Sequence, residues 1–333
     1  MKKFSIAAII LGALICVSGV TFSAGTADNW SATLQFSTNN TADLLPVKIG
    51  ESTSATEMLK PPPLPGMADT SSADDAIVNA YVRSASRQTA TSILTADASS
   101  PAKLWEMQVD VEEPNADVYV TPTLTDAYGL YKISIIDADT GARTVLTTGG
   151  QKVKVFTSGA SGANKTLYAM AGTSQTFAIA KSDGSVIGGT AIGGCSLDAC
   201  SYRSGINIYL DGSNNPTATT GTGGTFTISS LTAGSHPIKF DGDYMLASSG
   251  TLTVPTSGTS ATAVLDLRAG DAVEDANNTI DFQDLKCLKK VYKTSNPVCD
   301  LGGSVTGDAD FDLNGTVDFN DLKILKLNYK AKE

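Results

Sequence analysis

The stretch DFDLNGTVDFND, residues 310–321, carries oxygen-bearing side chains at regular positions of a twelve-residue loop. Counted from the first residue, positions 1, 3, 5, 9 and 12 are Asp310, Asp312, Asn314, Asp318 and Asp321. Position 6 is Gly315, which permits a sharp turn because glycine enters the left-handed region without steric cost. Position 7, Thr316, needs only its backbone carbonyl as a ligand. A hard cation takes about six to eight oxygens, so this spacing predicts a calcium-binding loop.

The pattern occurs twice, because residues 270–286 align without gaps with residues 307–323, at an offset of 37. Each copy runs from a loop into a short amphipathic segment, which predicts a helix after each loop. The side chains expected to face inward are Leu285, Leu288 and Val291 in the first helix and Leu322, Leu325 and Tyr329 in the second. Val317, at position 8 of the loop at 310–321, can pair its backbone with a second loop and point its side chain into the core.

The first loop departs from the pattern at two positions. Val273 stands at position 1, where it cannot bind calcium, and Asn278 stands at the glycine position. Asparagine tolerates the left-handed conformation, so the turn is retained. The remaining ligands would be Asp275, Asn277, Asp281, Asp284 and the carbonyl of Thr279. Asp271 or Glu274 could enter the site after a loop rearrangement. We therefore expect a first site that is weaker than the second, or empty.

Two loop–helix repeats of this kind resemble the type I dockerin, and the resemblance covers residues 269–333. It implies calcium-dependent folding and a cohesin partner on a scaffold or cell-surface protein. It also implies F-hands, which lack a leading helix, and residues 262–269 fit because they read as strand and turn. Positions that touch cohesin in this family correspond to Phe282, Gln283, Lys289 and Lys290 in the first repeat and to Phe319, Asn320 and Lys326 in the second. Two alternatives stay open: the phenylalanines could be buried between the repeats, and the lysines could be a solvated helix face.

Residues 183–268 read as short strands separated by turns. The segments GINIYLDG, residues 205–212, and GTFTISSLTAG, residues 224–234, resemble the carboxypeptidase regulatory-like, or transthyretin-like, β-sandwich. That resemblance implies a non-catalytic spacer or a carbohydrate-binding-like module. It implies no peptidase activity, because the chain has one histidine, His236, and no zinc triad of His and Glu.

Residues 28–182 contain short runs that alternate apolar and polar residues between turn signals, a pattern typical of an antiparallel β-sandwich. Trp30 and Trp105 lie in such runs, where tryptophan is more often a core residue than a platform for stacking carbohydrate. The proline-rich residues 61–66 are interpreted as a surface connector, with a partner ligand as the alternative. The acidic pairs at 74–75 and 112–113 are adjacent, so their side chains would diverge on a strand. No catalytic set emerges from this region.

Composition and the N-terminus indicate export. The formal charge of −10 argues against nucleic acid and suits a calcium-binding extracellular protein. Residues 1–25 combine two lysines, an apolar run and small residues, which predicts a cleaved signal peptide, with an uncleaved membrane anchor as the alternative. No other segment could span a membrane. The four cysteines left after cleavage predict two local disulfides, Cys195–Cys200 and Cys287–Cys299, with a zinc site as the alternative.

The sequence therefore predicts a mainly β protein, in which two antiparallel β-sandwich domains precede a small helical, dockerin-like module with paired F-hand calcium loops. The first functional hypothesis is a secreted, non-catalytic protein that docks through calcium onto a cohesin-bearing scaffold or surface protein, with carbohydrate as a candidate ligand of the sandwiches. The second is a dockerin-borne polysaccharide-degrading enzyme whose catalytic domain lies at the N-terminus. The third is a surface adhesin that calcium merely stiffens.

Overall fold

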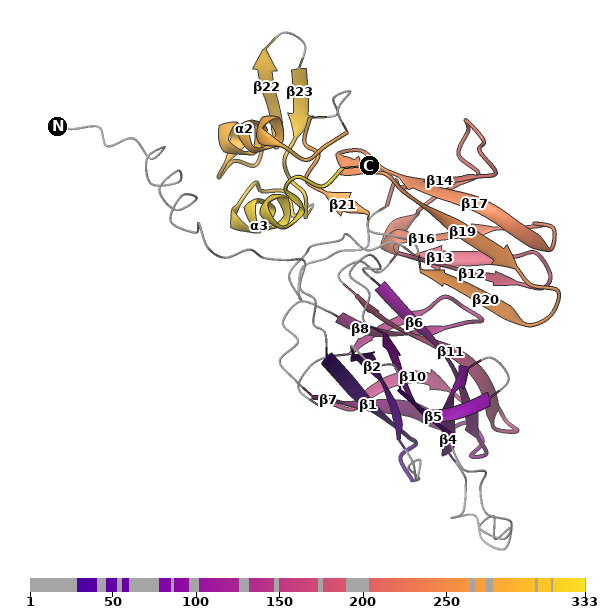
Figure 1. Ribbon diagram of the computed structural model, residues 1–333. Helices are drawn as coiled ribbons and strands as arrows, with labels where there is room; N and C mark the ends of the chain where they lie inside the picture. The colour runs from indigo at the N-terminus through magenta and orange to yellow at the C-terminus, as the bar shows by residue number, and fades with distance from the viewer. Residues whose placement is uncertain are drawn as a thin grey trace, which may run out of the picture.

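The computed structural model describes residues 29–40, 46–52, 56–59, 78–84, 87–95, 102–125, 132–146, 150–172, 176–189, 204–263, 267–273, 278–302, 305–312 and 314–332. Over these residues the chain is mainly β, with several antiparallel sheets and two short helices near the C-terminus, as expected (Figure 1). None of the described helices is long and apolar enough to cross a membrane. The predicted signal peptide, the proline-rich run and the Cys195–Cys200 pair lie outside the described residues.

The N-terminal region forms one hydrogen-bonded sheet of 11 strands instead of two separate sheets. Its strands are β1 (Asn29–Ser37), β2 (Val47–Ser52), β3 (Thr56–Leu59), β4 (Val78–Ser84), β5 (Arg87–Thr95), β6 (Ala102–Val111), β7 (Asp117–Thr125), β8 (Lys132–Asp137), β9 (Arg143–Leu146), β10 (Val153–Thr157) and β11 (Ala163–Gly172). The order is β10-β7-β1-β2-β5-β4-β6-β11-β8-β9, with β3 paired to β5. Alternate side chains, among them Leu34, Trp105 and Leu167, enter one core. Because the end strands β9 and β10 contact each other, the sheet curls around that core.

One pair in this sheet departs from the expected antiparallel arrangement. Strands β2 and β5 run parallel, with Lys48 opposite Thr91. Parallel neighbours need a crossover of a dozen or more residues, and the long segment between these two strands, which includes β3 and β4, provides it. Trp105 is buried, as its alternating pattern predicts.

The middle region packs two four-stranded antiparallel sheets face to face, in the orders β16-β13-β12-β20 and β15-β14-β17-β19. The first contains β12 (Phe177–Lys181), β13 (Val186–Gly189), β16 (Thr225–Ile228) and β20 (Thr259–Ala263). The second contains β14 (Asn207–Leu210), β15 (Ala218–Thr219), β17 (Gly234–Asp241) and β19 (Ser248–Val254), and a 3-10 turn, η1 (Thr222–Gly224), leads into β16. The Phe226 and Phe240 rings meet edge to face across the core, with centroids 5.6 Å apart.

A separate buried cluster joins the N-terminal sheet to the middle region. It contains Tyr168 and Met170 of β11 together with Phe177 and Ile179 of β12. The Tyr168 hydroxyl also lies 3.0 Å from the hydroxyl of Thr259 in β20. Strand β12 precedes the domain boundary expected at residues 182–183, yet it pairs with β13 and β20 of the middle region. The N-terminal sheet therefore ends at Gly172, and the middle region begins with β12 at Phe177.

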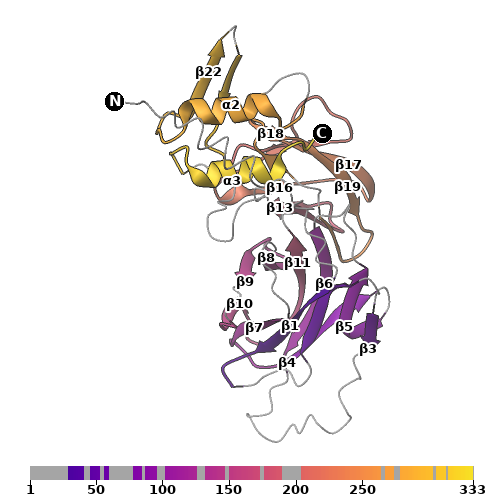
Figure 2. The ribbon, with the colours of Figure 1, turned by 60° about the vertical axis from the view of Figure 1, so that its left-hand side comes forward.

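The C-terminal module consists of α2 (Phe282–Val291), a hairpin of β22 (Val298–Gly302) and β23 (Val305–Asp308), and α3 (Phe319–Asn328). It does not stand apart from the middle region. Strand β18 (Met245–Leu246) of the middle region pairs with β21 (Arg268–Ala269) at the start of the module, and one continuous apolar core runs through both. Figures 1 and 2 show the hairpin projecting away from the sheets while the helices lie against the middle region.

The two repeats of the module hold each other by reciprocal backbone pairing. The amide of Lys293, after α2, donates to the carbonyl of Val317 at 2.7 Å, and the amide of Val317 donates to Thr294 at 2.9 Å. In the other repeat, Ile280 and Ala331 pair in the same way at 3.0 Å. Val317 is buried as expected, and its backbone pairs with the segment that follows the other repeat's helix.

Candidate metal centre

Three carboxylates of the second loop converge in the folded chain. Asp310, Asp312 and Asp321 are buried, and each places an oxygen within 4.8 Å of the others. Oxygen-only clusters of this kind suit hard cations. The cluster could therefore hold a metal ion.

The loop folds around these side chains because they accept hydrogen bonds from its own backbone. Asp310 accepts from the amides of Asn314 at 3.1 Å and Gly315 at 2.9 Å. Gly315 has a φ of +85°, the left-handed conformation that the spacing predicts. Phe311, between the first two aspartates, is buried and anchors the loop in the module core.

Asp321 connects the loop to helix α3. One of its oxygens accepts from the amides of Phe311 at 2.6 Å and Asp312 at 3.2 Å, and the other accepts from the amide of Asp318 at 2.8 Å. Asp318 caps the helix by accepting from the amide of Asn320 at 2.7 Å. This reciprocal capping fixes the helix start, so position 12 is held before any cation arrives.

Burial changes the titration of this cluster. It raises the pKa of Asp321 to about 6, with the nearby Asp312 charge adding to the rise. Burial also raises the pKa of Asp312, and the neighbouring Asp310 charge acts in the same direction. Like charges held together out of water favour a bound cation, because a cation offsets their repulsion.

The other expected ligands of the second loop lie nearer to solvent. The Asn314 amide donates to Asp312 at 3.0 Å, and its oxygen accepts from the amide of Thr316 at 2.8 Å. Both Asn314 and Thr316 are exposed, whereas Asp318 is half-buried. The structure thus brings the carboxylates of Asp310, Asp312 and Asp321 together, and the Asn314 side chain contacts this cluster through Asp312.

The first loop keeps the helix end of the site but not its beginning. Asp284 accepts from the amide of Asp281 at 2.6 Å, as Asp321 does from Asp318, and it also accepts from the amide of Val273 at 2.9 Å. Burial raises the pKa of Asp284 to about 6. Asn278 has a φ of +44°, so it takes over the glycine turn. Val273 is buried in the core, and Thr279 forms an isolated bridge with Lys332. The predicted ligands Asp275 and Asn277, and Glu274, lie outside the described residues.

Most of the side chains predicted to contact a partner are exposed. Phe282 and Phe319 are 55% and 57% exposed, so the alternative that they are buried between the repeats is wrong. Gln283, Lys289, Lys290 and Lys326 are also exposed, whereas Asn320 is half-buried. Tyr329, expected to face inward, is exposed as well.

A feature that the repeat alignment did not reveal is the pairing of each exposed phenylalanine with a lysine one helical turn later. The ammonium of Lys286 lies 5.0 Å from the centre of the Phe282 ring, and that of Lys323 lies 4.8 Å from the Phe319 ring. The i, i+4 spacing within each helix is the sequence signal that could have predicted these pairs.

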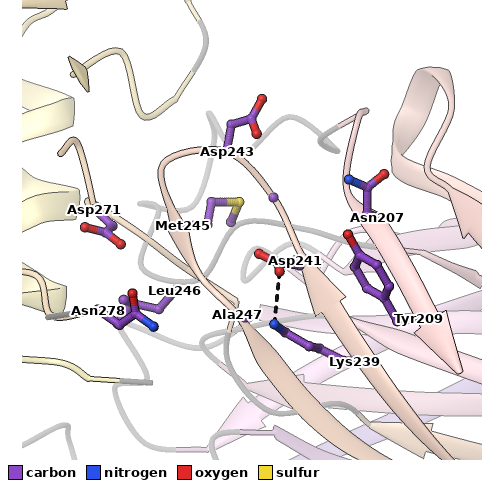
Figure 3. A pocket seen from close by; sticks show the side chains of 11 residues that line it. Asn207, Tyr209, Lys239, Asp241, Asp243, Met245, Leu246, Ala247, Asp271 and Asn278 are labelled. Carbon is purple, nitrogen blue, oxygen red and sulfur yellow. Dashed lines mark ion pairs between the residues drawn. The ribbon is translucent and has the colours of Figure 1, made fainter. Parts of the chain in front are cut away.

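A polar cavity of about 360 Å³ lies where the middle region meets the C-terminal module. Figure 3 shows Lys239 and Asp241 joined by an ion pair of 3.0 Å, with Tyr209 on one side and Asp271 and Asn278 on the other. The first three come from the outer face of β14 and β17, and the last two from the start of the module. The β18–β21 ladder connects the two walls of the cavity by backbone pairing, so the fold holds these walls together.

No protein-family model matches this sequence, and no curated protein is detectably similar to it.

Proposed function

We propose that this is an exported, non-catalytic, multi-module protein whose C-terminal module binds calcium and docks, through the calcium-bound form, onto a cohesin-bearing scaffold or surface protein. The observation that carries the proposal is the buried cluster of Asp310, Asp312 and Asp321, which stands at ligand positions 1, 3 and 12 of a twelve-residue loop. Calcium is favoured over transition metals because all candidate ligands are oxygens. Asn314, Asp318 and the carbonyl of Thr316 would complete the set.

The exposed apolar side chains support docking by the same module. Within the described part of the chain, the large hydrophobic residues that stand exposed are Phe282, Val298, Phe319, Leu327 and Tyr329, all of them in this module. Exposed apolar groups gathered on one part of a protein mark an interaction surface. Phe282 and Phe319 begin the helices that follow the loops, so a cation that orders a loop would also fix the neighbouring phenylalanine.

The test is to immobilise cohesin domains of several types and to measure binding of the full exported chain by biolayer interferometry, with calcium chloride or with EDTA. We expect binding with calcium and none with EDTA. The Phe319→Ser variant should lose partner binding while retaining calcium affinity. A chain that binds calcium but none of the cohesins would contradict docking and leave the metal site in place.

The shared core of the middle region and the module favours one further role, that calcium stiffens the end of a surface adhesin. A module that only docked would need no apolar continuity with its neighbour, whereas this one is continuous from Phe240 to Leu325. A rise in thermal stability with calcium, without capture by any cohesin, is the result expected for this role.

Carbohydrate is the ligand class that we propose for the cavity at the junction. Tyr209 offers a ring face, and the Lys239–Asp241 pair offers a donor beside an acceptor, as neighbouring sugar hydroxyls require. Three aspartates line the cavity against one lysine, which disfavours anionic ligands.

We expect cellobiose, but not glucuronate, to broaden NMR signals of the full chain, and Tyr209→Ala to abolish the effect. Thr253→Ala, an exposed change on β19, is the control.

A further inference from the structure

We propose that the Cys287–Cys299 disulfide, acting through Gly307, positions Asp310 and so sets the calcium affinity of the second loop. The inference rests on the proposed function, because it takes the aspartate cluster as a calcium site. It gives the β22–β23 hairpin, which contributes none of the predicted ligands, a role in holding the second loop.

The disulfide lies where the two repeats meet. Cys287 belongs to α2 of the first repeat, and Cys299 belongs to β22 of the hairpin, with Cα atoms 5.3 Å apart. Both cysteines are fully buried. In the hairpin, Cys299 stands directly opposite Gly307 of β23. The crosslink therefore holds the hairpin against the first repeat at the level of Gly307.

Gly307 is packed too closely to carry a side chain. A Cβ atom there would lie 2.0 Å from the carbonyl oxygen of Ala272 and 3.2 Å from the sulfur of Cys287. The next amide, that of Asp308, donates to the same Ala272 carbonyl at 3.1 Å, and the amide of Ala309 donates to Pro297 at 3.2 Å. Strand β23 is thus fixed on one side by the disulfide and on the other by the entry of the first loop.

The fixed backbone continues without interruption into the first ligand. The side chain of Asp308 accepts from the amide of Asp310 at 2.9 Å, and Ala309 between them is buried. Asp310 follows Gly307 by three residues. Its backbone is therefore held by the hairpin, while Asp321 holds the next residues of the loop through the amides of Phe311 and Asp312.

A crosslink at this point lowers the cost of calcium binding. Without it, the hairpin and the loop entrance would have to be ordered when the ion binds, and the lost backbone entropy would weaken the affinity. With it, Asp310 is already in place. We expect loss of the disulfide to weaken calcium binding by at least about tenfold, equivalent to about 1.4 kcal/mol.

The experiment compares the full exported chain with its Cys287→Ser/Cys299→Ser double variant by isothermal titration calorimetry with calcium chloride. The double variant should bind calcium at least about tenfold more weakly at unchanged stoichiometry. Amide exchange measured by NMR in EDTA should also become faster at Asp310 than in the wild type. Gly307→Ala, with the disulfide intact, should weaken binding in the same direction. Thr306→Ala, an exposed change in the same hairpin, is the matched control and should leave the affinity unchanged.

The outcomes separate this inference from the proposed function. Equal affinity in the wild type and the double variant would overturn the positioning role and leave the calcium site standing. A wild type that binds no calcium would overturn both. If the double variant does not fold, Gly307→Ala decides, since an unchanged affinity in that variant would reject the role of the hairpin.

Discussion

At the scale of single residues, the two repeats differ at the first position of the loop. Asp284 and Asp321 occupy the same place and each accepts from the amide of the residue that caps the helix, Asp281 or Asp318, although only the second loop has an aspartate at position 1. Position 12 is needed to start the helix, so it is kept in both loops. At position 1 of the second loop, Asp310 accepts from two loop amides, whereas in the first loop this position is Val273, which is buried in the core.

Replacing Asp310 with alanine should lower the calcium affinity of the second loop by at least about tenfold. The change removes one of the three converging carboxylates and the acceptor of two loop amides. Calorimetric titration of the full chain measures the effect. Asp300→Ala, in the exposed hairpin, is the control. Retention of most of the affinity in Asp310→Ala would show that the first loop is the stronger site.

His236 should titrate above its ordinary range. Its Nδ1 lies 3.0 Å from a carboxylate oxygen of Asp211, and its Nε2 lies 2.9 Å from the carbonyl of Thr232. Two acceptors favour the doubly protonated ring, so the Asp211 contact, helped by Thr232, raises the pKa of His236. The resulting stabilisation is fully present below about pH 6.5 and is lost as the pH rises through the higher folded-state pKa.

This titration is directly observable, because His236 is the one histidine of the chain and gives a single ring Cε1 proton signal. Its NMR midpoint should lie above about 6.5, the pKa of an unperturbed histidine. In Asp211→Asn the midpoint should fall, and a midpoint that does not move would show that the carboxylate contact is not the cause.

At the scale of elements, each loop is tied to the end of the other repeat's helix. Calcium in the second loop should therefore slow hydrogen exchange at the amide of Lys293, which donates to the carbonyl of Val317 although it lies in the other repeat. Exchange mass spectrometry with and without calcium measures this. Exchange at the amide of Gly184, which donates to the carbonyl of Lys181 in a turn of the middle region, should not change. Protection confined to residues 310–321 would mean that the repeats respond independently.

At the scale of the whole molecule, the middle region and the C-terminal module should unfold as one unit. They share a continuous core and the β18–β21 ladder, whereas the N-terminal sheet has a core of its own. At a free concentration about 100 times the dissociation constant, calcium should stabilise that unit by about 2.7 kcal/mol. Differential scanning calorimetry should show one transition that rises with calcium and a second, from the N-terminal sheet, that does not. A calcium-dependent transition of the module alone would contradict the shared core.

The sequence determined the features that depend on local chemistry. The ligand spacing predicted the turn at Gly315 and the helix starts, because a loop of alternating carboxylates caps its own backbone and the helix that follows. The Asp-Gly dipeptide at residues 211–212 is a local turn signal that favours positive φ at both residues, and their φ angles are 53° and 73°. The closure of Cys287 with Cys299 followed from a short separation of 12 residues.

Only the tertiary structure decided what depends on contacts between distant segments. Alternating patterns cannot tell one curled sheet from two stacked sheets, because both bury every second residue. For the same reason the parallel β2–β5 pair and the place of β12 in the middle sheet were not predictable. The exposure of Phe282 and Phe319 depends on how distant segments pack. So does the backbone pairing of Ile280 and Val317, each with the segment after the other repeat's helix. The types of side chain in the loop determine which residues are candidate ligands, while packing between the repeats decides which of them are buried close together.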